Sequence, residues 1–249
     1  MIYLKSSREL EMMRAAGCVV AGALRAAIGS VAPGVRTLDI DRVVEDYIRR
    51  RGAVPSFKGF KGFPASTCIS VNDEVVHGIP GPRRLKEGDI VSIDIGAVVN
   101  GYHGDAAVTV PVGDVSAEAL RLIEVTRAAL NRGIAAAIPG NRLSDIGHAI
   151  QTHVEGNGFS VVRDLVGHGI GRSMHEDPQV PNFGAPGTGP LLKVGMTLAL
   201  EPMVNAGGYE VHIRPDGWTV VTKDGSLSAH FEHTIAITEN GPILLTAEE

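Results

Sequence analysis

The chain has 249 residues, of which 44% are hydrophobic and 20% charged, which suits one globular domain with a substantial core. Its formal net charge of −5 argues against a nucleic-acid-binding protein, because neutralising phosphates needs clustered lysine and arginine. The two cysteines, Cys18 and Cys68, fit a reducing compartment rather than a disulfide framework. Neither an export signal nor a membrane-spanning stretch is visible. We therefore expect a cytoplasmic protein that binds neither nucleic acid nor membrane.

Two helices are predicted in the first fifty residues. Ser6 and Glu9 form a capping-box pattern before an apolar series at helical spacing. The segment 33–40, Pro-Gly-Val-Arg-Thr-Leu-Asp-Ile, opens a second helix that ends before Gly52. The basic run at 49–51 complements the dipole of that helix end, which we prefer to a contact with RNA.

A β-hairpin with two acidic residues follows. Residues 90–99 alternate in character and are followed by Asn-Gly, which predicts a two-residue type I′ turn. The resulting register sets Asp94 opposite Ala107 and Gly96 opposite Asp105, so the two aspartates share a face as diagonal neighbours. Two carboxylates that point into one space repel each other unless a cation compensates them. The pair indicates a metal site or an acid–base pair, and two solvated aspartates on an exposed sheet face are the alternative.

The segment at 139–146, Pro-Gly-Asn-Arg-Leu-Ser-Asp-Ile, repeats the one at 33–40. The same offset aligns Gly158 with Gly52 at the end of the following segment. A chance similarity over eight residues is the alternative. We interpret the match as an internal repeat.

The repeat predicts the architecture. Each copy follows a capped helix, which Ser116 begins in the second half, and precedes strand-rich sequence. This order is typical of an α+β fold. We expect one domain over 1–249, built from two pseudo-symmetric halves at about 1–110 and 111–249. Their strands would form one curved antiparallel sheet with the helices on one face.

Three further candidate metal-binding residues lie in the second half. His168 stands in Gly-His-Gly-Ile-Gly, where the glycines permit close backbone approach and leave the imidazole accessible. Glu201 ends an apolar strand, because Pro202 cannot donate to a sheet ladder. Glu232 begins an alternating strand. Glutamate is rarely buried without a partner, so acids in such sequence indicate a shared cation site.

The number of candidate ligands favours two ions. The set is Asp94, Asp105, His168, Glu201 and Glu232. One histidine and four carboxylates exceed a single tetrahedral site, and no cysteine accompanies them, which argues against structural zinc. Oxygen donors with one imidazole suit Mn, Fe, Co or Zn in a dinuclear hydrolytic centre.

These residues resemble the metal-ligand set of the methionine aminopeptidases. The matching motifs are Asp94, His-Gly-Asp105, Gly-His168-Gly-Ile-Gly, Glu201-Pro-Met and Phe-Glu232-His-Thr, together with Val-Val-His-Gly-Ile-Pro at 75–80 and Asp-Gly-Trp-Thr at 216–219. The resemblance covers essentially the whole chain and implies the pita-bread fold. The chain begins at its first helix, without the N-terminal domain of prolidases, and the interval between His168 and Glu201 is too short for the type II insertion. The short form of type I fits best, with one departure: Val76 stands where bacterial members often have cysteine.

The resemblance implies a function and roles for the ligands. The expected activity is removal of the N-terminal methionine from nascent proteins, with a preference for a small second residue. Asp105, His168, Glu201 and Glu232 would hold the tighter of two ions. Asp94 would hold the second, with Asp105 and Glu232 as bridges, and Glu201 would accept and return the proton.

The resemblance also implies residues that contact the substrate. His77 and His175 would lie near the scissile amide and the developing oxyanion, although His77 by itself would more often be a hydrogen-bonded loop histidine. The implied methionine pocket consists of Phe60, Phe63, Cys68, Met174 and Trp218. Simple core packing is the alternative for Phe60, Phe63 and Cys68. Trp218 follows a Pro-Asp-Gly turn, so we expect it to be partly exposed.

The other histidines are expected to be structural, with His103 supporting Asp105. The remaining histidines are His148, His153, His212, His230 and His233. We expect a monomer. The family also admits a transient association with the ribosome, although an acidic chain offers no obvious RNA-binding face.

Three rival functions stay open at this stage. The first is a peptidase of the same fold that cuts X-Pro bonds. The second is a metal-free pita-bread binding protein, which would lack the ligands. The third is a phosphoesterase, for which the sequence supplies no phosphate clamp.

Overall fold

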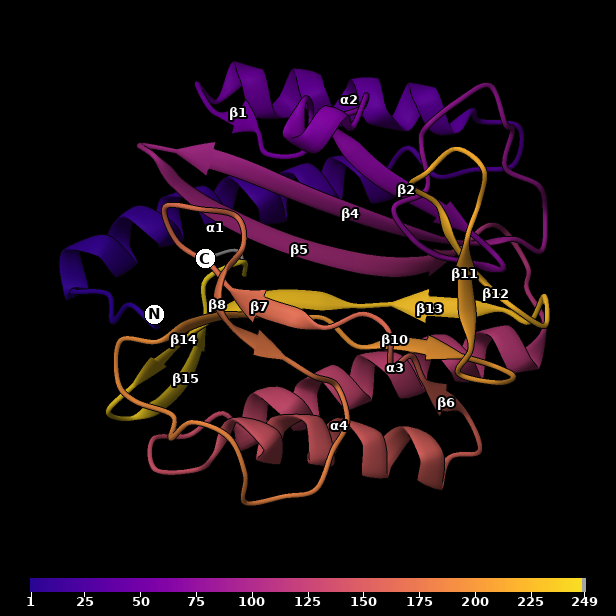
Figure 1. The fold of residues 1–249 in the computed structure, drawn as a ribbon. Coiled ribbons are helices and arrows are strands. Elements are labelled where there is room, and N and C mark those ends of the chain that lie inside the picture. The colour runs from indigo at the N-terminus through magenta and orange to yellow at the C-terminus, as the bar shows by residue number, and fades with distance from the viewer. Residues whose placement is uncertain (248–249) are drawn as a thin grey trace.

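The structure is a computed structural model that describes residues 1–247, and its elements alternate between helices and strands in both halves of the chain (Figure 1). The helices are α1 (Ser7–Ile28), α2 (Thr37–Arg50), α3 (Ala117–Ala136) and α4 (Leu143–Gly156), with a short 3-10 helix at Phe60–Gly62. The strands of the first half are β1 (Val54–Pro55), β2 (Thr67–Val71), β3 (Glu74–Val76), β4 (Ile90–Val99) and β5 (Tyr102–Pro111). The later strands are β6 (Ser160–Val161), β7 (Gly167–Gly169), β8 (Glu176–Val180), β9 (Thr197–Leu200), β10 (Met203–Asn205), β11 (Val211–Ile213), β12 (Val220–Thr222), β13 (Ser228–His230), β14 (Glu232–Thr238) and β15 (Gly241–Leu244).

The repeat has the same backbone geometry in both copies. Gly34 and Gly140, which precede α2 and α4, have φ angles of 88° and 91°. Gly52 and Gly158, which follow these helices, have φ angles of 70° and 77°. Positive φ favours glycine because it has no Cβ, so the paired glycines mark equivalent turns. The helix pairs of the two halves are therefore pseudo-symmetric, as predicted.

The predicted hairpin is confirmed in turn and register. Asn100 and Gly101 have φ angles of 50° and 77°, as a type I′ turn requires. In the pairing of β4 with β5, Asp94 lies opposite Ala107 and Gly96 opposite Asp105. The two aspartates therefore share one face of the sheet, as the sequence pattern indicates.

One curved antiparallel sheet joins the two halves (Figure 1). Its nine strands run in the order β1-β4-β5-β14-β9-β7-β8, with β2 paired to β4 and β15 paired to β14. The junction between the halves is the pair β5–β14, in which Glu232 lies opposite Ala107. A small sheet, β11-β12-β3, makes a second junction, and β13-β10-β6 is a third sheet. The predicted α+β pita-bread fold is confirmed, while the division at about residue 110 stays a prediction.

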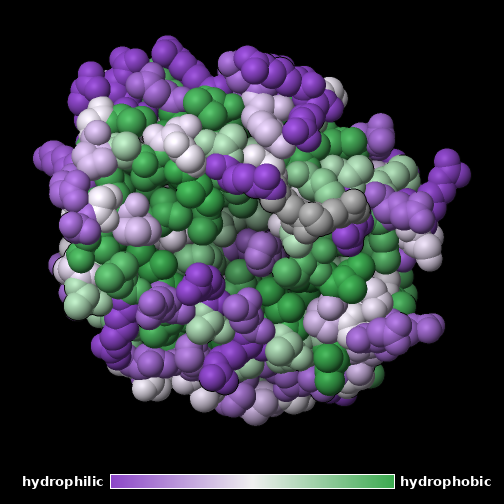
Figure 2. Space-filling view, turned by 180° about the vertical axis from the view of Figure 1, so that it is seen from behind, coloured by the Kyte–Doolittle hydropathy of each residue, from purple (hydrophilic) through white to green (hydrophobic). Residues whose placement is uncertain are grey.

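Each helix pair buries an apolar face against the strands. Val20, Ile40 and Ile93 belong to a buried cluster formed by α1, α2 and β4. Leu122 and Ile146 belong to the corresponding cluster of the second half. Hydrophobic residues also gather in the middle of the face turned away in Figure 1, with hydrophilic residues toward its rim (Figure 2). Within residues 1–247, no helix has the length and apolar character to cross a membrane.

Gly17 in α1 packs directly against the C-terminal segment. A Cβ at this position would lie 1.9 Å from the backbone oxygen of Leu245. We expect Gly17→Ala to lower the free energy of unfolding by about 1–3 kcal/mol, because a backbone contact must open to admit the methyl group. Urea denaturation followed by circular dichroism measures this. Gly156→Ala is the matched control, since no atom lies within 4 Å of its added Cβ. An equal loss in both variants would show that the close contact is unimportant.

Candidate active site

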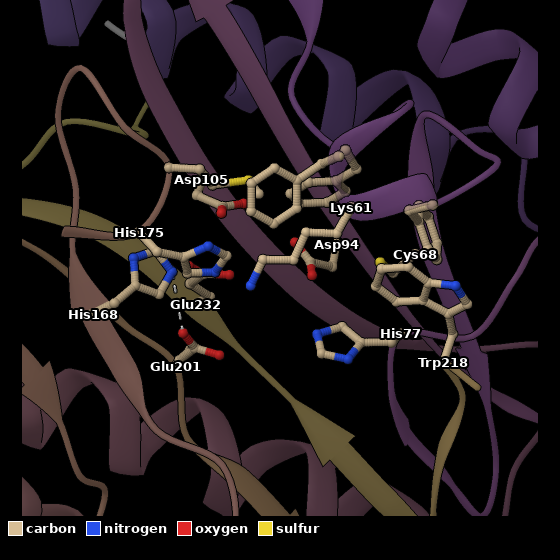
Figure 3. A pocket seen from close by; sticks show the side chains of 14 residues that line it. Lys61, Cys68, His77, Asp94, Asp105, His168, His175, Glu201, Trp218 and Glu232 are labelled. Atoms are coloured by element: carbon tan, nitrogen blue, oxygen red, sulfur yellow. Dashed lines mark ion pairs between the residues drawn. The ribbon is translucent and has the colours of Figure 1, made fainter. Parts of the chain in front are cut away.

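The five predicted metal-binding residues line one cavity of about 270 Å³ (Figure 3). The other lining residues are Phe57, Phe60, Lys61, Phe63, Cys68, His77, Met174, His175 and Trp218. Every residue predicted to bind metal or substrate therefore lies at this cavity. The sequence placed these residues in both halves, and the fold brings them together.

The sheet order explains why the five residues meet. Asp94, Asp105 and Glu232 come from β4, β5 and β14, which are neighbours in the sheet. Glu201 directly follows β9, and His168 is the middle residue of β7, so the next two strands supply the remaining groups. Five adjacent strands thus contribute one group each. Between Asp94 and Glu232 the facing residue of β5 is alanine, whose small side chain leaves space for both acids.

The closest group in this arrangement is Asp105, His168 and Glu232. One potential ligand atom from each of them lies within 4.8 Å of the others. Oε1 of Glu201 lies 3.5 Å from Nε2 of His168. Nδ1 of His168 donates to the Gly169 carbonyl at 2.9 Å, because a carbonyl can only accept, which leaves Nε2 unprotonated toward the acids.

His168 departs from one expectation. The sequence predicted an accessible imidazole, but only 8% of His168 is exposed. The prediction was wrong because the flanking glycines do not open the segment to solvent. They let β7 pack closely: a Cβ at Gly167 would lie 2.4 Å from the Ala199 carbonyl oxygen. Burial is the main cause that lowers the His168 pKa to about 4, followed by the nearby His175, so the ring is neutral and able to bind a metal.

The four acids are unfavourable to ionise without a cation. Burial raises the pKa of Asp94 to about 7. Burial also raises the pKa of Asp105, Glu201 and Glu232 well above the usual range, and repulsion from neighbouring carboxylates adds to it. One oxygen each of Asp94, Asp105 and Glu232 is buried without a hydrogen-bond partner in the structure. Such oxygens are costly to bury unless a cation binds them. The residues therefore fit a divalent metal.

The other side of the cavity is apolar. Phe63, Cys68 and Met174 belong to one buried cluster, against which Phe60 and Trp218 pack. The ring centroids of Phe63 and Trp218 are 5.1 Å apart in an edge-on arrangement. Burial is the main cause that raises the Cys68 pKa well above its usual range, followed by nearby carboxylates, so its sulfur is an uncharged thiol. Trp218 is partly exposed, as predicted.

Two histidines stand between the acids and the apolar wall. His77 is half-buried and has a φ angle of 59°, unusual for a residue with a side chain. Burial, and then His175, lowers its pKa. His175 is exposed at the cavity, with its ring 4.3 Å from that of His168. Partial loss of contact with water at the cavity, and then the charge of Lys61, lower its pKa, so both histidines are neutral near pH 7.

Three residues at or near the cavity were missed from the sequence. Phe57 and Lys61 line it, and Figure 3 shows the Lys61 side chain extending into it. His230 was expected to be merely structural, but its Nε2 lies 4.0 Å from Oε2 of Glu201. Its position two residues before Glu232 was a signal, because alternate side chains of an extended segment point to the same side. The glycine on either side of Phe60-Lys61 was a weaker signal for a special loop.

His103 lies close to the site but does not line the cavity. Its Nδ1 is 2.9 Å from the Ser56 hydroxyl, and its backbone N–H donates to the Gly171 carbonyl. It therefore connects β5 to two neighbouring loops, in agreement with a supporting role.

Comparison with known proteins agrees with this geometry. Residues 11–239 match the model of metallopeptidase family M24. A methionine aminopeptidase of Clostridium perfringens is 57% identical over 246 residues, which are 99% of each chain, and methionine aminopeptidase 1 of Bacillus subtilis is 56% identical over the same length and coverage. The chain belongs to the methionine aminopeptidases of family M24. The crystal structure of the methionine aminopeptidase from Thermotoga maritima has a TM-score of 0.98, 51% identity and full coverage of both chains.

Family membership confirms the predicted enzyme class. The methionine aminopeptidases of family M24 are hydrolases that use divalent metal, and the acids and histidine of the cavity are suited to hold it. The departure at Val76 lies outside the cavity lining. Its side chain is buried in a cluster with Val162, Met203 and Val220.

Divalent metal should stabilise the folded protein. We expect Mn or Co, added to chelator-treated protein at a free concentration about 100 times the Kd of the metal, to raise the free energy of unfolding by roughly 2.7 kcal/mol. For a chain of this length, that corresponds to a rise in Tm of about 5–10 °C. Asp105→Asn should remove most of the rise, because it deletes a carboxylate of the closest group. Differential scanning fluorimetry measures the shift. Asp114→Asn, at an exposed aspartate, is the control. An undiminished shift in Asp105→Asn would contradict the assignment.

Proposed function

We propose that this enzyme removes the N-terminal methionine from nascent proteins with the help of two divalent ions. The observation that carries the proposal is the convergence of five metal-binding groups from adjacent strands beside an apolar pocket. Metal chemistry and a site for an apolar side chain thus share one cavity. The relatives are methionine aminopeptidases, so we take that side chain to be methionine.

The strand order supports two ions rather than one. Asp94 lies at one end of the row, and Glu201 and His168 lie at the other. Asp105 and Glu232 stand between these ends and would help to hold both ions, with Asp94 on one side and Glu201 and His168 on the other. Bound Mn, Fe, Co or Zn would supply a water of lowered pKa and a Lewis acid for the scissile carbonyl.

The residues around the ions explain why only a chain end would react. Cys68 of the apolar wall is paired with Asp94 across β2 and β4. A methionine whose side chain is held by this wall would therefore have its α-amine near Asp94, at one end of the row of candidate ligands. A free amine is attracted there, whereas an acylated one carries no charge and fills the space.

The protein groups needed for proton transfer and charge stabilisation are also present. Glu201 is partly buried and lines the cavity beside the other acids, a position that suits a group that accepts and returns a proton. His77 and His175 are neutral donors on two sides of the cavity. In other enzymes, one such donor contributes roughly 2.7–4 kcal/mol to the transition state.

Further parts of the proposal concern selectivity and setting. His77, His175 and Lys61 crowd the cavity, which supports a preference for a small second residue. We also propose that the chain is one catalytic domain with halves at about 1–110 and 111–249. It would act as a monomer in the cytoplasm, where newly made chains are found. It would associate transiently with the ribosome.

Peptide cleavage tests the function directly. Chelated enzyme titrated with Co or Mn should release methionine from Met-Gly-Met and leave Gly-Pro intact. N-acetyl-Met-Gly-Met should be stable, because its amine is blocked. Chromatography of the products measures release, and calorimetry gives the number of ions bound. Turnover of Gly-Pro alone would favour an X-Pro peptidase instead.

Substitutions separate metal binding from catalysis. We expect Asp105→Ala and Glu201→Ala to abolish methionine release with the fold retained. His175→Ala should lower kcat by about 10²–10³ while metal remains bound, because it removes only a donor to the oxyanion. Circular dichroism, metal content and kinetics distinguish these effects. Full activity in Glu201→Ala would rule out its role in proton transfer.

A further inference from the structure

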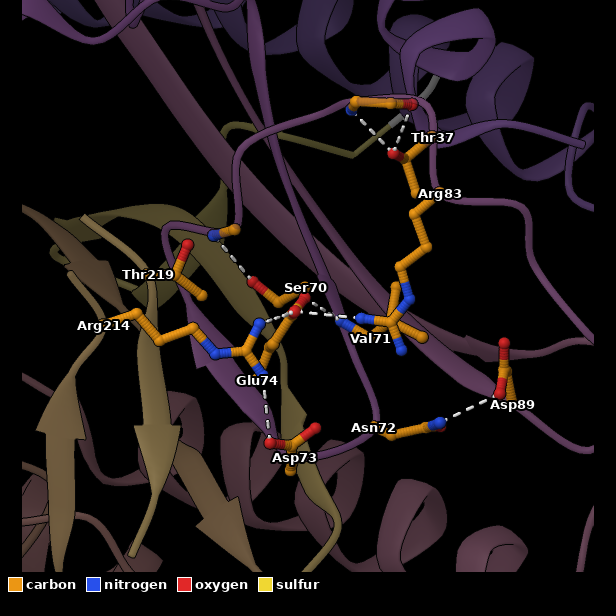
Figure 4. Close-up of polar contacts among 12 residues, drawn as sticks. Thr37, Ser70, Val71, Asn72, Asp73, Glu74, Arg83, Asp89, Arg214 and Thr219 are labelled. Carbon is orange, nitrogen blue, oxygen red and sulfur yellow. Dashed lines mark hydrogen bonds and ion pairs between the residues drawn. The ribbon is translucent and has the colours of Figure 1, made fainter. Parts of the chain in front are cut away.

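Glu74 lies outside the cavity but connects two segments that form its walls (Figure 4). It begins β3 and is 7% exposed. Its Oε1 accepts hydrogen bonds from Nη1 of Arg83 at 2.9 Å and from Nη1 of Arg214 at 2.6 Å. Its Oε2 accepts from the Val71 backbone N–H at 2.8 Å. We propose that Glu74 is a positioning residue that sets His77 through Arg83 and Trp218 through Arg214.

Arg83, the first arginine partner of Glu74, stands at the end of the segment that begins with His77. This segment leaves β3 with His77 in a left-handed conformation, which persists only where the surroundings hold it. The next residue, Gly78, donates to the Ser70 hydroxyl at 3.1 Å. Farther on, the Arg83 carbonyl accepts from the Thr37 backbone N–H at 3.0 Å. Glu74 thus holds the far end of a segment whose near end is strained at the catalytic histidine.

Arg214, the second arginine partner of Glu74, stands at the start of the turn that contains Trp218. The Arg214 backbone N–H donates to the Thr219 carbonyl at 2.8 Å, which closes the turn. Asp216 accepts from the Trp218 backbone N–H at 2.8 Å. These hydrogen bonds hold the turn together, so the contact of Glu74 with Arg214 sets the position of the indole. An ion pair between Arg214 and Asp73, at 3.2 Å, also holds the Arg214 side chain in place.

The carboxylate is suited to this role by its burial and charge. Its hydrogen bonds to two guanidinium groups are charge-assisted and therefore stronger than neutral ones. Arg83 and Glu74 belong to the first half of the chain, and Arg214 to the second, so the contact fixes one half against the other. Its hydrogen bonds and ion pairs in the structure go to none of the five proposed metal ligands. Loss of Glu74 should therefore disturb substrate groups and leave metal binding intact.

The inference rests on the proposed function and predicts that the two arginines affect different kinetic constants. Arg214→Met should raise KM for Met-Gly-Met about tenfold with little change in kcat, because Trp218 and the apolar wall proposed to bind the methionine side chain are held less firmly. Arg83→Met should lower kcat about tenfold with little change in KM, because His77 moves. Glu74→Gln should do both. Arg83→Lys should recover most of kcat, since a single donor of Arg83 contacts Glu74.

Trp218 provides a readout that does not need activity. It is the single tryptophan of the chain, so fluorescence excited selectively at the long-wavelength edge of the indole band, where the four tyrosines do not absorb, reports its surroundings alone. Emission should shift in Glu74→Gln and Arg214→Met and stay unchanged in Arg83→Met. Metal affinity measured by calorimetry should stay within about twofold in all three, since a larger change would mean that the ligands had moved.

Arg49→Met is the matched control. Arg49 pairs with Glu45 at 2.8 Å in an arginine–glutamate contact on α2, away from β3. It should change neither kinetic constant nor the emission. Unchanged constants and emission in Glu74→Gln would overturn the proposal, and so would a parallel loss of metal affinity and stability. Wild-type enzyme that releases no methionine would overturn the proposed function instead, while the fluorescence comparison would still decide the role of Glu74.

Discussion

Four carboxylates that face one buried space are the constraint on which the rest of this structure depends. Ionised carboxylates repel each other, and burial makes each charge more costly, so the pKa of each of the four is raised. One oxygen each of Asp94, Asp105 and Glu232 is buried without a hydrogen-bond partner in the structure. A site of this kind lowers stability unless it binds cations. Its presence in the middle of a well-packed sheet therefore indicates function rather than folding.

The sheet makes this arrangement possible by joining two halves. Neither half contains the full set: β4 and β5 supply two acids, and β7, β9 and β14 supply the rest. The β5–β14 pair brings these groups together on one side of the cavity. The β3–β12 pair, with the Glu74 contacts, joins the halves at the substrate side. The candidate metal ligands and the proposed substrate-contacting groups are thus positioned by different junctions of the same fold.

Local patterns predicted much of this molecule because they depend on neighbours along the chain. The capping box at Ser6 and the Asn-Gly turn form wherever the backbone allows them, since their hydrogen bonds lie within a few residues. The register from that turn placed Asp94 and Asp105 on one face. The likeness of the two Pro-Gly segments likewise predicted equivalent helix starts. One wrong prediction came where glycine was ambiguous: around His168 it permits close packing of strands rather than exposure.

The sequence by itself determined the helix pairs, the hairpin register, the choice of candidate metal-binding residues and, through resemblance, the family. Only the tertiary structure decided that His230 lies near Glu201, that Lys61 extends into the cavity, and that Glu74 contacts arginines of both halves. The reason is physical. Spacing along a strand or helix sets which residues share a face, whereas contacts between distant segments depend on how whole elements pack, and no local pattern encodes the partner of a single charged side chain.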